Sequence, residues 1–200
     1  MSSKPVKKRR YTMRARADAA SATADRILAA AEARFLTRPF AEVTLAEVAD
    51  DAGVTVQTVM RRYGSKEELA EAASRAAVER VRRERMEAPV GDVAGAVRNL
   101  CDHYEAWGDA VLRLVEQARE VPAWRRVTEQ GRQLHVEWVG ATFAPFIARI
   151  AEEHRSRRSA MLVAVTDAQM WHMLRRTAGL PRDQVEQSLR ELIDAVLSAR

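Results

Sequence analysis

Apolar residues recur at helical spacing along most of the chain, and no stretch shows the strict alternation that indicates a strand. Ile27, Ala31 and Phe35 stand at i, i+4 and i+8, which predicts a helix that follows Thr23 and ends near Thr37. The pattern therefore predicts an all-α protein. The further helices are expected at 45–52, 56–63, 66–87, 92–107, 109–119, 123–150, 157–178 and 182–198.

Start and stop signals are densest between residues 44 and 69. Thr44 and Glu47 form a T-x-x-E capping box, and Ser65 and Glu68 repeat the pattern. Gly53 stands where the first of these helices must end in a left-handed turn. Thr55 can then cap a brief second helix. A helix, a tight glycine turn and a helix are typical of the helix-turn-helix of DNA-binding proteins.

The second of these short helices can be oriented at 100° per residue. With Val59 at the centre of the buried side, Gln57 and Arg61 point away from the core. These side chains can pair with the edges of adenine and guanine. The same pattern also fits a solvated face of a small helical bundle, and this helix alone does not decide between the two interpretations. Tyr63, Val56 and Thr55 are expected on the buried side, and Thr58, Met60 and Arg62 on the flanks.

Many spaced positions agree at once with a known pattern over residues 22–70. They include Thr44-Leu45, Val48-Ala49, Ala52-Gly53-Val54, Thr58-Val59, Tyr63 and Ser65-Lys66-Glu67-Glu68-Leu69, preceded by the helix Asp25–Phe35 and the pair Pro39-Phe40. The segment resembles the DNA-binding domain of the TetR family of bacterial transcriptional regulators. The resemblance implies an N-terminal helix-turn-helix domain over 21–68 and a C-terminal helical domain for ligand binding and dimerisation over 69–200.

The resemblance also implies a mode of action. Such proteins bind inverted-repeat operators as homodimers, and a small molecule held among the C-terminal helices alters the spacing of the two DNA-reading domains. We expect Gln57 and Arg61 to contact bases, with Thr58 beside them, and we expect phosphate contacts from Thr44, Thr55, Arg62 and Lys66. The last two helices are expected to pair with their copies in the homodimer.

One position departs from the family pattern. Met60 stands where the family usually has an aromatic residue, often Tyr, that touches a DNA phosphate. A methionine can contact a thymine methyl group but cannot donate that hydrogen bond, and the neighbouring Arg61-Arg62 pair could supply the missing attraction. Met60 and the acidic body of the chain leave open an alternative, a helical ligand-binding or interaction module that has lost DNA binding.

Charge is unevenly distributed along the chain. Seven basic residues precede the first acidic one, Asp18, and the remainder carries 26 basic and 28 acidic residues. Residues 1–20 are therefore predicted to form a basic disordered arm that follows the DNA backbone or minor groove. A solubilising tail or a cloning remnant would have the same composition. The arginines at 80, 82, 83 and 85 are expected to form a solvated face.

Little in the sequence indicates catalysis, a cofactor or a metal site. A single cysteine excludes an internal disulfide, and the four histidines include no i, i+4 pair. The neighbours Cys101, Asp102 and His103 point in different directions on one helix and cannot form a relay. No apolar run is long enough to span a membrane and no secretory signal is present, so we expect a cytoplasmic protein that is not an enzyme.

Aromatic residues are concentrated in the C-terminal half. Such side chains at helical spacing usually form ordinary core, but together they can also line a mostly apolar ligand cavity. We therefore expect a small, unidentified effector, most simply one that releases a repressor from DNA. The candidate lining residues are His103, Tyr104, Trp107, Trp138 and Trp171.

Overall fold

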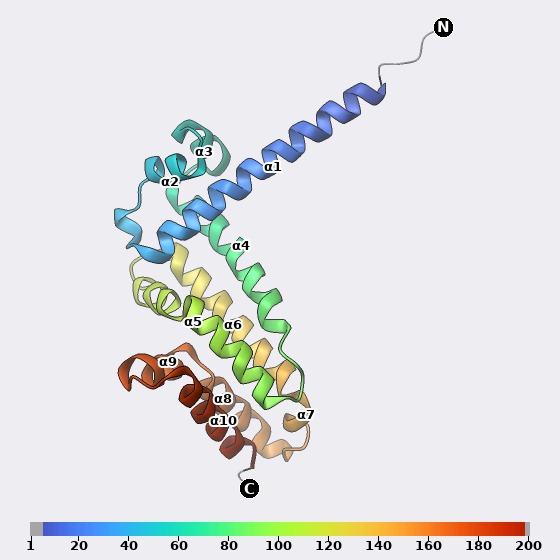
Figure 1. Cartoon of the computed structure of the whole chain (residues 1–200), viewed down its shortest axis with the longest axis vertical. Coiled ribbons are helices and arrows are strands. Elements are labelled where there is room, and N and C mark those ends of the chain that lie inside the picture. Colours follow the sequence, from blue (N-terminus) through green and yellow to red (C-terminus); the bar gives the residue numbers. More distant parts are fainter. Residues whose placement is uncertain (1–5, 199–200) are drawn as a thin grey trace. The chain divides into compact units, whose positions relative to one another are not determined.

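The computed structural model describes residues 6–198, with side chains described from residue 15 onward except at residue 16. Every regular element in this range is helical, which confirms the predicted all-α class (Figure 1). The elements are α1 (Val6–Thr37), η1 (Phe40–Glu42), α2 (Leu45–Ala52), α3 (Val56–Tyr63), α4 (Lys66–Met86), α5 (Val93–Gln117), α6 (Pro122–Thr142), α7 (Ala144–Ile147), α8 (Glu152–Val165), α9 (Ala168–His172), η2 (Met173–Thr177, a π-helical turn) and α10 (Arg182–Ser198).

The chain divides into two compact units, Met1–Ala76 and Ala77–Arg200. The division lies within α4, whereas the sequence placed it earlier in the same helix, between residues 68 and 69. Unit 1 therefore contains the helix-turn-helix, and unit 2 contains the helices that follow it.

Helix α1 is much longer than expected. It begins at Val6 and not after Thr23, which corrects the expectation of a disordered arm for residues 6–20. This segment is rich in Ala, Arg and Lys, which favour helix, and it contains no Gly or Pro. Residues 17–22 are exposed, and Figure 1 shows the N-terminal half of α1 extending beyond α2 and α3. Residues 1–5 of the predicted arm lie outside the described residues.

The core of unit 1 is small and comes from all its helices. The expected stripe of α1, formed by Ile27, Ala31 and Phe35, is buried. Val48 of α2, Val59 of α3 and the apolar residues at the start of α4 are buried as well. This shared core fixes the faces that α2 and α3 turn to the solvent.

In unit 2, helix α5 is continuous from Val93 to Gln117 and passes through Gly108, where the sequence predicted a break. A Cβ atom at Gly108 would lie 2.5 Å from Cζ3 of Trp171. The glycine therefore allows Trp171 of α9 to approach the α5 backbone, and it does not end the helix.

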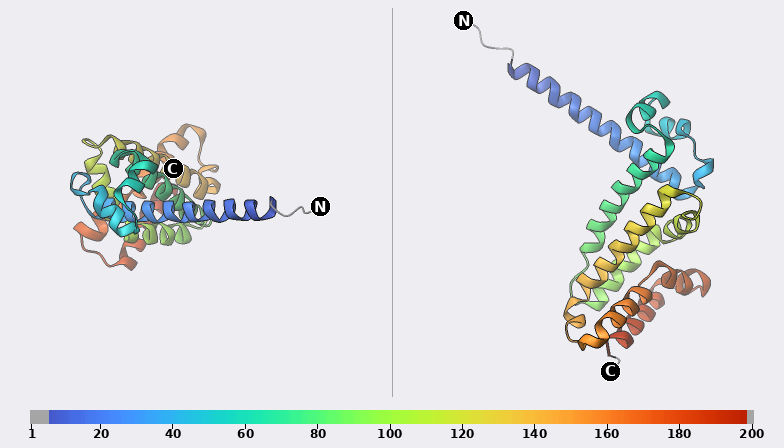
Figure 2. Two further views of the ribbon diagram at one scale, coloured as in Figure 1. Left: turned by 90° about the horizontal axis from the view of Figure 1, so that it is seen from above. Right: turned by 180° about the vertical axis from the view of Figure 1, so that it is seen from behind.

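Two other long predicted helices are interrupted. The helix expected at 123–150 ends at Thr142, and Pro145 lies in the first turn of α7, as the expected bend requires. The helix expected at 157–178 begins earlier, at Glu152, and ends at Val165. Asp167 then caps α9, since its carboxylate accepts a 2.8 Å hydrogen bond from the Gln169 N–H. The predicted last helix is present as α10, which packs beside α8 (Figure 2).

Candidate nucleic-acid interface and effector site

The predicted capping box at the start of α2 is confirmed. Thr44 Oγ1 accepts a hydrogen bond from the Glu47 N–H at 3.2 Å, and Glu47 Oε2 accepts one from the Thr44 N–H at 2.8 Å. The bond from the Thr44 N–H and a further one from Arg38 lower the pKa of Glu47 to about 2, so that its carboxylate stays charged. Gly53 ends α2 with φ at 64°, which confirms the left-handed turn.

Arginines of α1 hold α2 in place, a feature that helical periodicity did not reveal. Arg34 donates two hydrogen bonds to the Asp51 carboxylate, at 2.6 and 2.9 Å, and one to Glu47 at 3.1 Å. Arg26 Nε donates at 3.1 Å to the carbonyl oxygen of Ala52, the last residue of α2. A two-bond contact between an arginine and a carboxylate fixes orientation. These contacts therefore set the orientation of α2, and of the turn that follows it, relative to α1.

Helix α3 is short, capped and anchored by one residue. Thr55 Oγ1 accepts from the Thr58 N–H at 3.2 Å, and Val59 is fully buried. Gln57 and Arg61 are exposed, and neither forms a hydrogen bond or ion pair with any described residue. Their predicted outward orientation is confirmed, and their contact with DNA stays a prediction.

Two apolar side chains lie beside this pair on the exposed surface. Val56 is 41% exposed, which corrects its predicted place on the buried side. Val56 is the first residue of α3, and it precedes the helical turn in which Val59 packs into the core. Met60 is 43% exposed and lies one turn from Val56, so that an apolar strip runs next to the strip of Gln57 and Arg61. Helix α3 thus carries both hydrogen-bonding and apolar groups on its exposed surface.

The residues expected to bind phosphate differ in how many of their hydrogen-bond donors are already used within the protein. Arg62 is exposed and, within residues 6–198, has no partner. The Lys66 ammonium donates to the carbonyl oxygens of Phe40 and Val43, at 2.8 and 2.9 Å, and lies 4.4 Å from the centroid of the Phe40 ring. It therefore fixes η1, and only one of its three N–H groups remains for a phosphate.

The side chains considered for catalysis do not converge. Cys101 is buried, and burial raises the pKa of its thiol to about 12, which keeps it protonated. Asp102 is exposed and forms a 2.6 Å ion pair with Arg182 of α10. No group of three potential metal ligands occurs within the described part of the chain.

Four of the five candidate ligand residues come together, and Trp107 does not. Tyr104, Trp138 and Trp171 are buried in the core of unit 2, and the rings of Tyr104 and Trp171 lie 5.8 Å apart. His103 lies beside Tyr104, with 5.3 Å between the ring centroids. Trp107 is only half-buried and packs under the guanidinium of Arg80, at 5.2 Å.

Arg85 is the residue of this region that the sequence prediction misplaced. It was expected on a solvated face, but it is only 4% exposed and its guanidinium lies 4.0 Å from the centroid of the Trp138 ring. A signal was present, because Val78, Val81 and Arg85 follow the i, i+3, i+7 spacing of a buried helix face.

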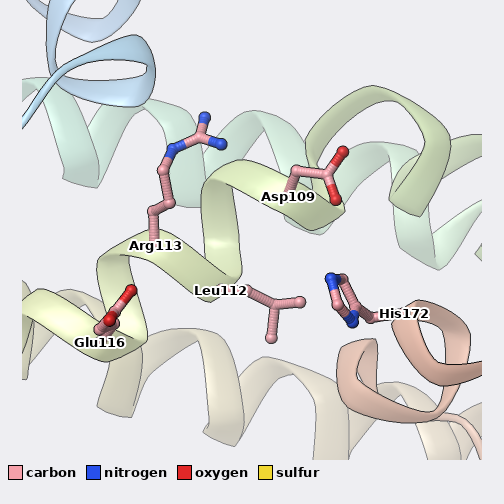
Figure 3. A pocket seen from close by; sticks show the side chains of 5 residues that line it. All are labelled: Asp109, Leu112, Arg113, Glu116 and His172. Atoms are coloured by element: carbon pink, nitrogen blue, oxygen red, sulfur yellow. The ribbon is translucent and has the colours of Figure 1, made fainter. Parts of the chain in front are cut away.

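An open depression lies elsewhere in unit 2, between α5 and the end of α9. It has a volume of about 340 Å³ and is lined by Asp109, Leu112, Arg113, Glu116 and His172 (Figure 3). None of the five predicted ligand residues lines it. Its lining is mostly charged, which does not suit the mostly apolar effector expected from the sequence.

The sequence around the helix-turn-helix matches that of a known protein family. Residues 27–73 match the sequence model of a family described as bacterial regulatory proteins, tetR family. A comparison with curated proteins found no match. The predicted resemblance is thus confirmed for the segment that contains α2, α3 and their supporting helices.

Solved structures of transcriptional regulators share the fold of most of the chain. A protein from Mesorhizobium loti assigned to the TetR family has a TM-score of 0.70 at 16% identity, with 88% of this chain and 95% of that chain covered. A transcriptional regulator from Rhodococcus sp. Rha1 has a TM-score of 0.68 at 20% identity, with 87% and 95% covered. The fatty acid degradation regulator FadR from Bacillus halodurans has a TM-score of 0.61 at 15% identity, with 88% and 97% covered.

The fold is therefore that of TetR-family transcriptional regulators, with an N-terminal helix-turn-helix domain and a C-terminal helical domain. Within residues 6–198, no helix combines the length and the apolar character needed to cross a membrane.

Proposed function

We propose that this protein is a sequence-specific DNA-binding regulator that acts as a homodimer on an inverted-repeat operator. The observation that carries the proposal is the pair Gln57 and Arg61, both exposed and without a partner among the described residues, on a helix that the turn at Gly53 fixes. A recognition helix needs free hydrogen-bonding groups on a rigid support, and α3 provides them.

Helix α3 divides its contacts among three kinds of DNA group. Arg61 pairs with guanine and Gln57 with adenine, while Val56 and Met60 pack against thymine methyl groups. Thr44, Thr55 and Arg62 contact phosphates at the edges of the groove, Thr58 lies on the flank, and Lys66 contributes its one remaining N–H group. The basic residues before Asp18 add attraction that does not depend on sequence.

Dimerisation is part of the proposal, because one short helix reads too few bases for a specific site. The apolar stripe of α10, which includes Val185, Leu189 and Ile193, is buried inside unit 2. The surface left for the two-fold contact is thus the outward face of α8 and α10. On α8 this face carries Ala160, Met161 and Ala164, whose small or flexible side chains allow close helix packing.

We further propose that the protein is a repressor that a small ligand releases from DNA. The support is the group of buried aromatic and polar side chains in unit 2, which is suited to hold and orient a guest. Release requires that the ligand bind one of two conformations more tightly than the other.

Selection of bound sequences from a random DNA pool tests the proposal. We expect an inverted repeat whose half-sites are separated by about one turn of DNA or a multiple of it, bound by two subunits. A mobility-shift titration against salt then separates the alternatives. Absent or salt-insensitive binding would favour a helical interaction module that has lost DNA binding.

A further inference from the structure

Arg85 is a buried charge without a counter-ion. It is only 4% exposed, and no described acidic side chain forms an ion pair with it. Its Nη2 atom lies 3.4 Å from Nδ1 of His135, and its Nε atom is buried without a hydrogen-bond partner. Buried arginines are normally paired with a carboxylate or fully hydrogen-bonded, because the loss of hydration is otherwise uncompensated.

The groups around Arg85 do not supply the missing negative charge. The guanidinium lies 4.0 Å from the centroid of the Trp138 ring and 5.7 Å from that of Tyr104, and such contacts compensate only part of the lost hydration. Burial, with a smaller effect of Arg85, lowers the pKa of His103 to about 3 and that of His135 to about 4. Both histidines are therefore neutral near pH 7, and the cluster carries the single positive charge of Arg85.

Among the other polar atoms around Arg85, some are held by hydrogen bonds and one has no hydrogen-bond partner. Tyr104 Oη donates at 3.0 Å to the carbonyl oxygen of Thr166, and Nε2 of His135 lies 3.2 Å from the Thr166 hydroxyl. Nδ1 of His103 is buried without a hydrogen-bond partner. One cation with free polar atoms beside it is the arrangement that binds a carboxylate group.

The walls of this interior are apolar and mainly aromatic. Trp138 contacts His135 and Phe143, with ring centroids 5.8 Å apart in each pair, and Trp171 lies at the same centroid distance from Tyr104. Leu100 and Leu162 belong to the same buried cluster. Such walls accept a hydrocarbon or aromatic body, whereas a multiply charged guest would leave charges unpaired.

We propose that Arg85 is the anion-binding residue of the effector site and that the effector is a small monocarboxylic acid with an apolar body. Its carboxylate accepts from the guanidinium, and its body displaces or parts the side chains around Trp138. The role of effector rests on the proposed function, but the binding itself does not.

Binding is tested on the full-length protein without DNA, with acids paired against their uncharged amides. The probes are phenylacetate with phenylacetamide and octanoate with octanamide, at constant ionic strength. We expect at least one acid to raise the unfolding temperature and quench tryptophan fluorescence, with an affinity about tenfold or more above that of its amide. Equal affinities within each pair, or no binding of either acid, would overturn the inference.

Substitutions identify the residue. In Arg85→Met the preference for the acid is lost, and the unfolding temperature of the free protein stays the same or rises, because an uncompensated buried charge has been removed. Arg83→Met is the matched control: Arg83 is an exposed arginine of α4, and its substitution leaves the preference intact. A lower unfolding temperature of Arg85→Met with no acid preference in the wild type would show that Arg85 only supports the packing of Trp138 and Tyr104. Arg85→Lys, which keeps the charge, retains part of the preference and serves if the methionine variant does not fold.

Separate readouts keep this inference apart from the proposed function. If the acids bind through Arg85 but the protein binds no DNA, the inference stands and the proposed function fails. If DNA binding is specific but no acid is preferred over its amide, the proposed function stands and the inference fails.

Discussion

Single residues of α3 decide which chemical groups this helix exposes to a proposed DNA partner. Gln57 and Arg61 offer hydrogen bonds, while Val56 and Met60 offer an exposed apolar strip one turn long. The sequence predicted the outward orientation of the polar pair, because helical spacing from Val59 determines it. It did not predict the exposure of Val56, which depends on where the anchoring contacts of α3 begin.

Met60 is expected to recognise a thymine methyl group. We predict that replacing that thymine with deoxyuridine, which lacks the methyl group, weakens wild-type binding by roughly 0.8 kcal/mol, the value of one buried carbon. In Met60→Ala the same replacement has little effect. Fluorescence anisotropy with both DNAs and both proteins measures the difference, and an equal loss in the variant would rule out this contact.

The buried histidines predict an acid-sensitive unit 2. The pKa of His103 is about 3 and that of His135 about 4, below the usual 6.5, so the unfolded chain binds protons first as the pH falls. Stability is therefore complete above pH 6.5 and decreases below it, by at most about 1.4 kcal/mol per pH unit for each histidine. Glu47, whose pKa is about 2 against a usual 4.5, adds a loss in the same direction only at lower pH.

Chemical denaturation between pH 6.5 and 5 checks this dependence. We expect His103→Phe to reduce the slope of stability against pH, because it removes a buried group whose pKa is about 3. An unaltered slope in the phenylalanine variant would show that His103 does not titrate in this way.

At the scale of elements, local sequence signals determine the bounds of some helices, and contacts between distant residues determine those of others. The bounds of α2 and α3 were predicted well, because Thr44, Gly53 and Thr55 act within a few residues of their own position. The continuity of α5 through Gly108 was missed, because the reason for that glycine is Trp171, distant in sequence. The break at Asp167 likewise depends on contacts that spacing alone does not specify.

Gly108 and Gly131 provide a matched test of this reasoning. Gly108→Ala is expected to lower the free energy of unfolding by about 1–3 kcal/mol, because its Cβ would lie 2.5 Å from the Trp171 ring. Gly131→Ala, in α6 with nothing within 4 Å of the added atom, is expected to raise it by up to about 1 kcal/mol through helix propensity. Denaturant unfolding measures both changes, and stabilisation by both would contradict the packing of Trp171 on α5.

The N-terminal extension of α1 gives a prediction about DNA affinity. Deletion of residues 2–16 removes seven basic residues, and we expect weaker binding with a smaller dependence on salt. Each lost phosphate contact lowers the slope of log affinity against log salt by about 0.9. The remaining chain must keep its helicity in this variant. If it does and the slope of log affinity against log salt is unchanged, the extension does not contact DNA.

For the whole molecule, the sequence predicted the fold and the helix-turn-helix segment better than the charge buried in unit 2. The helix-turn-helix unit is marked by closely spaced signals between Thr44 and Leu69, and residues 27–73 match the family model. Four of the five predicted ligand residues do come together, but the charge that defines their chemistry, Arg85, was assigned to the surface. The burial of Arg85 was missed because the charged composition of residues 80–85 was weighted above the i, i+3, i+7 spacing of Val78, Val81 and Arg85.

The most direct measurement compares the operator preference of the wild type with that of Arg61→Ala. Fluorescence anisotropy is recorded on the selected operator and on scrambled DNA of equal length, with Arg98→Ala, which removes an exposed arginine of unit 2, as the charge-matched control. We predict that Arg61→Ala loses about 1–3 kcal/mol on the operator and keeps its affinity for scrambled DNA, while the control behaves as the wild type. An operator preference that survives in Arg61→Ala, or a loss that is equal on both DNAs, would contradict base recognition by α3.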